Sequence, residues 1–134
     1  MKDFVYQRQI HFADTDGAGV VYFANLLSIC HEAYEHYLAI ELQFNLADFF
    51  QDKLTAIPIV HADIDFFQPL FCGDQINITL DFNLISEKIF EIRYHISKED
   101  EKVATALTRH ICINPQTRKT QSLPEKLRSI SGLV

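Results

Sequence analysis

Residues 12–25 have the sequence FADTDGAGVVYFAN, and this segment joins a short alternating stretch to a long helical pattern. Asp and Gly tolerate backbone conformations that other residues avoid, so the run from Asp14 to Gly19 predicts a tight acidic loop. A long helix that starts near Val21–Phe23 and runs through residues 26–42 is predicted, because apolar residues recur at the spacing of one helical face. That face consists of Phe23, Leu26, Leu27, Cys30, Tyr34, Tyr37 and Leu38.

The acidic loop and the start of the helix together suggest a site for chemistry on a carbonyl group. A helix N-terminus presents unpaired N–H groups and roughly half a positive charge, which stabilise an oxyanion that develops in a reaction. We expect the Asp16 carboxylate and the N–H groups of Val21, Tyr22 and Phe23 to converge on such a carbonyl. The alternative is structural, since acidic loops before helices commonly serve capping and turn formation.

The composition fits one globular domain over residues 1–134. The chain is 48% hydrophobic, with 11 Phe, 5 Tyr, only 4 Gly and only 4 Pro, so a sizeable core can form. Its net charge of −6 disfavours nucleic acid as a partner, because phosphate binding needs a basic field. No apolar run approaches the roughly 20 residues that span a membrane, and no signal peptide is visible after Met1.

Cysteine and histidine positions argue against a metal site. Cys30, Cys72 and Cys112 lack paired ligand spacing, and they are typical of reduced thiols in a cytoplasmic protein. His31 and His36 are five residues apart, which is off the i, i+4 spacing of two ligands on one helical face. We therefore expect no metal and no cofactor.

The rest of the chain predicts mostly strands. A first strand is expected at 4–12, a short helix started by Asn45 at 44–53, further strands at 57–67, 75–84, 90–96 and 103–113, and a last short helix at 123–130. The helix at 44–53 is either a lid over a pocket or packing. A sheet with one apolar face needs a cover, and the long helix is the only large candidate. We therefore expect an α+β fold in which a curved antiparallel sheet of about five strands wraps around one long central helix.

Three sequence blocks carry a resemblance to a known family: Ala13–Phe23, Cys30–Glu35 and Pro58–Phe67. The first resembles the loop of hotdog-fold acyl-CoA thioesterases of the 4-hydroxybenzoyl-CoA thioesterase type. The three blocks together are similar to 1,4-dihydroxy-2-naphthoyl-CoA hydrolases of cyanobacterial type, over most of the chain from about Tyr6 to about Pro124. The resemblance implies a hotdog fold and hydrolysis of this acyl-CoA in phylloquinone biosynthesis.

The resemblance also implies residue roles. Asp16, just before Gly-Ala-Gly, matches the catalytic carboxylate, which acts either as nucleophile or as general base on water. Asp14 is expected to brace the loop by accepting backbone hydrogen bonds. Gly19, His31 and His61 are candidate substrate-binding residues, and His31 stands where the 4-hydroxybenzoyl enzyme has an aspartate that contacts the phenolic hydroxyl. The alternative for both histidines is packing within the fold.

Basic side chains near the last strands are candidates for binding CoA phosphates, although charges on a strand's outer face are also solubilising. They are Arg93, Arg109, Arg118 and Lys119. One sheet leaves an open edge, and the family closes it in homodimers that often pair into homotetramers. Two other functions stay open: a thioesterase for other aryl- or short acyl-CoAs, and a non-catalytic hotdog module that binds acyl ligands.

Overall fold

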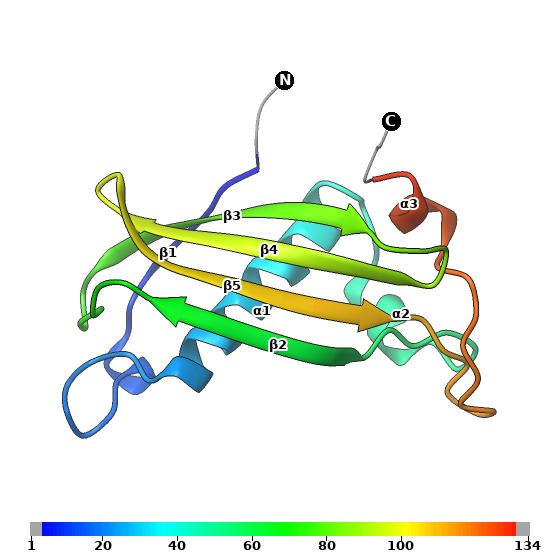
Figure 1. Ribbon diagram of the computed structural model, residues 1–134, viewed down its shortest axis with the longest axis horizontal. Coiled ribbons are helices and arrows are strands. Elements are labelled where there is room, and N and C mark those ends of the chain that lie inside the picture. Colours follow the sequence, from blue (N-terminus) through cyan, green and yellow to red (C-terminus); the bar gives the residue numbers. More distant parts are fainter. Residues whose placement is uncertain (1–3, 131–134) are drawn as a thin grey trace.

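The computed structural model describes residues 4–130, and its strands form one antiparallel sheet (Figure 1). The strands are β1 (Tyr6–Gln9), β2 (Ile59–Phe66), β3 (Gln75–Leu84), β4 (Ile89–Lys98) and β5 (Glu101–Ile111), in the spatial order β1-β3-β4-β5-β2. This arrangement confirms the predicted fold class. The predicted domain of residues 1–134 includes residues 1–3 and 131–134, which lie outside the described range.

Helix α1 (Phe23–Ile40) covers one face of the sheet and links the β1 edge to the β2 edge (Figure 1). The period-2 pattern of the strands explains this packing, because alternate side chains point to the same face. The core joins residues of α1 to the inward-facing residues of the strands. On α1 these buried residues are Leu26, Ile29, Cys30, Ala33, Tyr34 and Leu38, and on β4 they are Phe90, Ile92, Tyr94 and Ile96.

The element boundaries correct several predictions. Helix α1 begins at Phe23, within the predicted start at Val21–Phe23, but Phe23 itself is exposed rather than part of the buried face. The first strand is shorter than predicted, because the chain turns into a 3-10 helix, η1 (Phe12–Asp14). Helix α2 (Leu46–Gln51) starts as predicted at Asn45, whose side chain accepts a hydrogen bond of 3.0 Å from the Asp48 N–H.

Helix α3 (Glu125–Arg128) follows Pro124 and buries Leu127 against the core. Pro124 lies just before the helix, where its missing N–H costs no helical hydrogen bond. Within residues 4–130, no helix combines the length and the apolar character that crossing a membrane requires.

Candidate active site

The acidic loop is closed by hydrogen bonds across its base. Thr15 and Val21 form an isolated antiparallel bridge. Inside this bridge the Asp16 N–H donates to the Val20 carbonyl at 2.9 Å, and the Gly19 N–H donates to the Asp16 carbonyl at 2.9 Å. Gly19 has φ = +85°, a conformation that glycine adopts without the steric cost that a side chain would add. The loop is therefore a compact turn that ends where α1 begins.

Asp16 borders a cavity of about 480 Å³ at the start of α1. One carboxylate oxygen, Oδ1, accepts a hydrogen bond of 2.8 Å from the Ala18 N–H, and the side chain is otherwise exposed. The lining of the cavity comes from the loop, from the start of α1 and from the segment after β2. Its residues are Asp16, Val20, Val21, Tyr22, Phe23, Phe66, Phe67, Gln68 and Pro69.

The three backbone N–H groups predicted to stabilise an oxyanion differ in availability. The Val21 N–H donates to the Leu70 carbonyl at 3.0 Å, so it is already occupied. The N–H groups of Tyr22 and Phe23 have no acceptor among residues 4–130, and Tyr22 provides no side-chain cap for the helix. The positive end of α1 is thus left open beside the Asp16 cavity.

Aromatic side chains form the walls of this cavity. Tyr22 and Phe23 have ring centroids 4.7 Å apart, and Phe66 and Phe67 lie at the end of β2. The Lys102 ammonium group stands 5.3 Å from the centre of the Phe67 ring. Sequence analysis did not assign the segment from Phe66 to Pro69 to the site. The adjacent pair Phe66-Phe67 was the available signal, because it breaks the alternation of a half-buried strand.

The two predicted substrate-binding histidines lie outside the lining of the Asp16 cavity. On α1, His31 Nδ1 is 2.7 Å from Glu35 Oε2, and the imidazole packs edge-on against Tyr34. On β2, His61 Nε2 is 3.0 Å from Asp63 Oδ2. Gly19 lies in the loop but is not part of the lining either. Within one chain, the two histidines are therefore not brought to the Asp16 cavity, whereas Gly19 contacts Asp16 through the loop backbone.

The four basic candidates are also not gathered at the cavity. Arg93 and Arg109 alternate with inward-facing residues, so they lie on the outer face of the sheet, where Arg109 Nη2 is 2.8 Å from Glu91 Oε2. Arg118 and Lys119 follow the Ile111 end of β5, whereas Gln68 in the cavity wall bonds to Val103 near the β5 start. The length of β5 separates these positions by roughly 30 Å.

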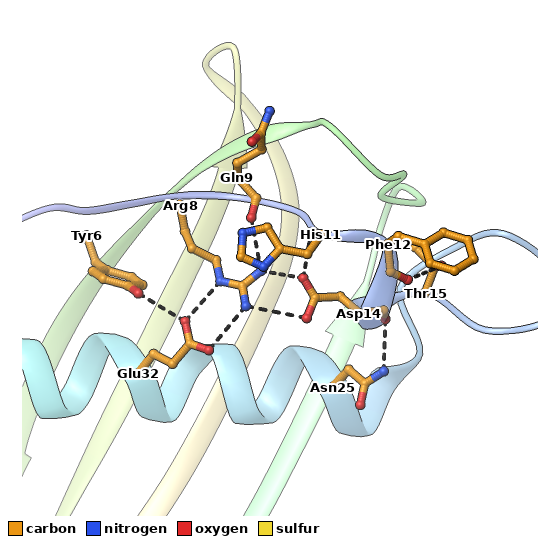
Figure 2. A network of polar contacts seen from close by, with 9 residues as sticks. All are labelled: Tyr6, Arg8, Gln9, His11, Phe12, Asp14, Thr15, Asn25 and Glu32. Carbon is orange, nitrogen blue, oxygen red and sulfur yellow. Dashed lines mark hydrogen bonds and ion pairs between the residues drawn. The ribbon is translucent and has the colours of Figure 1, made fainter.

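Asp14 is the centre of a polar network behind the loop (Figure 2). Its carboxylate accepts a hydrogen bond of 2.7 Å from the His11 N–H, as expected for a loop brace, and forms an ion pair with Arg8. Burial alone raises the pKa of Asp14, but the hydrogen bonds from Arg8 and from the His11 N–H lower that pKa below its ordinary value. Asp14 is therefore held as a carboxylate. Residues 4–130 contain no cluster of His, Cys, Asp and Glu that could hold a metal ion.

The chain is similar to known proteins along most of its length. The model of the thioesterase-like superfamily matches residues 10–130. A 1,4-dihydroxy-2-naphthoyl-CoA hydrolase from Microcystis aeruginosa is 54% identical over 129 residues, covering 96% of this chain and 93% of the relative. The crystal structure of a 1,4-dihydroxy-2-naphthoyl-CoA thioesterase from Synechocystis superposes with a TM-score of 0.90 at 39% identity, covering 99% of this chain and 98% of that one.

A gentisyl-coenzyme A thioesterase of known structure is more distant. It has a TM-score of 0.83 at 29% identity and covers 93% of this chain and 99% of its own. Because the superfamily model matches nearly the whole described chain, and because the relatives match along almost their full length, this chain belongs to the thioesterase-like superfamily and has its hotdog fold.

Proposed function

We propose that this protein is a thioesterase that hydrolyses 1,4-dihydroxy-2-naphthoyl-CoA to 1,4-dihydroxy-2-naphthoate and CoA, a step of phylloquinone biosynthesis. The observation that carries the proposal is that the Asp16 carboxylate and the uncapped start of α1 border one cavity. Relatives with this activity in their names share about half of the sequence over most of its length. The aromatic lining suits a flat, fused-ring acyl group, which stacks favourably on Tyr and Phe side chains.

The proposed reaction places the thioester carbonyl oxygen at the N–H groups of Tyr22 and Phe23. These donors, with the positive end of α1, stabilise the negative charge that the oxygen gains when the carbonyl carbon is attacked. Asp16 has one carboxylate oxygen that accepts from Ala18, and the other has no donor among residues 4–130. That second oxygen is the one that acts on the substrate or on water.

Two routes fit this placement. In the first, Asp16 takes a proton from water, the water oxygen bonds to the acyl carbon, the C–S bond breaks, and the proton passes to the CoA thiolate. In the second, Asp16 itself bonds to the acyl carbon and expels the thiolate, and water then hydrolyses the resulting anhydride. Both routes need the ionised carboxylate and consume one water.

A second copy of the chain is proposed to complete the site. Strand β2 forms a sheet edge with exposed Ile59, Val60 and Phe66, and a long apolar edge favours pairing with another strand. Antiparallel pairing of two β2 strands would bring the Ile59 end of one copy beside the Phe66 end of the other. The histidine at position 61 and the basic turn at 118–119 of that copy would then approach this cavity. We therefore propose a homodimer, two of which pair into a homotetramer.

A thiol-release assay tests the proposal. It compares 1,4-dihydroxy-2-naphthoyl-CoA with gentisyl-, benzoyl- and palmitoyl-CoA, using the wild type and Asp16→Asn. We expect the largest kcat/KM for the naphthoyl ester and loss of turnover in the variant. Absence of thiol release from any of the four esters, together with tight binding, would instead establish a non-catalytic ligand-binding module.

A broader aryl-CoA thioesterase is the second candidate, and one observation favours it. The gentisyl-coenzyme A thioesterase shares the fold at 29% identity, and the aromatic walls of the Asp16 cavity can stack on a single ring as well as on a fused pair. Comparable kcat/KM values for the naphthoyl, gentisyl and benzoyl esters in the same assay would support this function over the specific one.

A further inference from the structure

Arg8 on β1 connects the first strand to both the acidic loop and the helix (Figure 2). Its side chain is 12% exposed. On one side its Nε and Nη2 donate to the two carboxylate oxygens of Glu32 on α1, at 2.9 and 3.2 Å. On the other side its Nη1 and Nη2 donate to the carboxylate of Asp14. A planar guanidinium can make both paired contacts at once, whereas an ammonium group cannot.

Glu32 is itself fixed from β1. It accepts a further hydrogen bond of 3.0 Å from the Tyr6 hydroxyl. One cation therefore stands between two carboxylates that come from different elements. Although burial lowers the pKa of Arg8, the hydrogen bonds to Asp14 and Glu32 raise it above its ordinary value. The guanidinium stays charged, and the link between β1, α1 and the loop persists across the pH range of ordinary assays.

Asp14 is held at both of its ends. Arg8 and the His11 N–H hold its carboxylate, and the side-chain amide of Asn25, in the first turn of α1, donates to its carbonyl oxygen at 2.8 Å. The next residue, Thr15, forms the bridge that closes the loop. Asp16 comes directly after Thr15, and its own side chain accepts only the Ala18 N–H among the described residues. The position of the Asp16 carboxylate therefore depends on the backbone that Asp14 fixes.

We propose that Arg8, supported by Glu32, is a positioning residue that holds the Asp16 carboxylate at the carbonyl bound by the start of α1. The proposal rests on the proposed thioesterase function. Arg8 does not line the Asp16 cavity, so it acts on the substrate through Asp14 and the loop backbone. Displacing a reacting group by about 1 Å costs on the order of 100-fold in rate, so loosening this anchor should reduce kcat more than it weakens substrate binding.

The first test compares Arg8→Gln and Arg8→Lys with a matched control, Lys98→Gln. Lys98 forms a partly buried ion pair with Asp74 but does not touch the loop. We expect Arg8→Gln to lower kcat by about 10- to 100-fold, with KM changing by no more than about threefold. Arg8→Lys keeps the charge without the paired contacts, so its kcat should lie between those of Arg8→Gln and the wild type. The kcat of Lys98→Gln should equal that of the wild type. A wild-type kcat in Arg8→Gln would overturn the proposal.

The second test asks whether Arg8 acts through Asp16. Adding Arg8→Gln to Asp16→Asn should cause no further loss of the residual thiol-release rate, because the group being positioned is already missing. An additional loss as large as the one that Arg8→Gln causes in the wild type would show that Arg8 does not act through Asp16. The thermal midpoint of each variant, measured beside its rate, separates these two effects.

A third measurement does not require activity. The Ala18 and Gly19 N–H groups both donate to Asp16, to its carboxylate and to its carbonyl respectively. Amide hydrogen exchange at these positions should be faster in Arg8→Gln than in the wild type and in Lys98→Gln. Unchanged exchange would overturn the proposed coupling, whether or not the wild type hydrolyses the naphthoyl ester. Absence of wild-type turnover with faster exchange would reject the proposed function and keep the coupling.

Discussion

Thr15 and Val21 form an isolated antiparallel β-bridge, and this bridge sets the geometry of the candidate site. Asp16 directly follows Thr15, and Tyr22 directly follows Val21. Both residues line the same cavity, which brings the Asp16 carboxylate close to the Tyr22 N–H, a donor without an acceptor among residues 4–130. An acid and an electropositive helix start are thus brought together within one short segment of the chain, which tertiary contacts from Arg8 and from Leu70 hold at its two ends.

Asp16→Asn should remove hydrolysis and leave the fold intact. The asparagine Oδ1 can still accept the hydrogen bond that the Ala18 N–H donates to Asp16, so the loop loses no contact. The charge that activates water or attacks the thioester is lost, and we expect kcat to fall by about 10²- to 10⁴-fold. The checks are thiol release and the thermal midpoint, which should stay within about 2 °C. The matched control is Asp48→Asn, which removes an exposed carboxylate on α2, changes the net charge equally and should keep wild-type turnover. Equal turnover in Asp16→Asn and Asp48→Asn would contradict the mechanism.

Gly19→Ala should destabilise the loop, whereas Gly17→Ala should not. A Cβ at either position meets no atom within 4 Å, but only Gly19 has a positive φ, of +85°. The cost at Gly19 is therefore backbone strain alone, about 1 kcal/mol of unfolding free energy. Gly17→Ala should be neutral or slightly stabilising. Urea unfolding of the two variants measures this difference, and equal midpoints would show that the φ of Gly19 does not constrain the loop.

The fold could be predicted because its patterns are local. Strand β3 alternates apolar and polar residues along its length, and α1 repeats its apolar residues at helical spacing. The start of α1 lacks the Ser, Thr, Asp or Asn that usually precedes a first turn. Its N-terminal flanking residue is Tyr22, which provides no side-chain cap. That missing cap is the same feature that leaves N–H groups open at the cavity.

The parts of the site that sequence analysis missed depend on tertiary contacts. The wall of Phe66 and Phe67 lies about fifty residues from the loop in the chain, and no periodicity relates the two. The Val21 N–H finds its acceptor at Leu70, which only the folded chain brings near. The alternation of buried and exposed residues along β5 predicts that Arg109 lies on the outer face of the sheet. That pattern does not predict which end of the sheet lies near the cavity. Arg8 alternates with the exposed Gln7 and Gln9 on β1, and its role emerges only from its partners.

Val60→Lys should separate the proposed dimer. Val60 lies on the β2 edge with 56% of its surface exposed, and a charge there opposes strand pairing between two copies. Val5→Lys is the matched control, since Val5 is 44% exposed beside the other edge strand, β1. Light scattering after size exclusion should give an oligomer for the wild type and Val5→Lys and a monomer for Val60→Lys. A monomeric wild type would contradict pairing through β2.

The buried imidazole of His110 should make folding stability fall in mild acid. His110 is fully buried on β5, stacks on Phe90 with ring centroids 4.5 Å apart, and has its Nε2 2.8 Å from Thr108 Oγ1. Burial, and secondarily the neighbouring His31, lowers its pKa to about 3. In the unfolded chain a histidine titrates near pH 6.5. Between about pH 6.5 and 3 the unfolded state binds a proton that the folded state excludes, so unfolding becomes easier as the pH drops.

Urea unfolding at pH 7.5, 6.0 and 5.0 measures this effect. The free energy of unfolding should be flat above about pH 7 and then fall by up to about 1.4 kcal/mol for each pH unit below 6. Asp14 contributes in a separate pH range. The stability that its lowered pKa supplies is lost only when the pH falls below the ordinary carboxyl value, near 4. His110→Gln should flatten the curve between pH 6.5 and 5, whereas His95→Gln, on the outer sheet face, should keep the wild-type slope. A wild-type free energy that stays constant from pH 7.5 to 5.0 would show that His110 accepts a proton without unfolding.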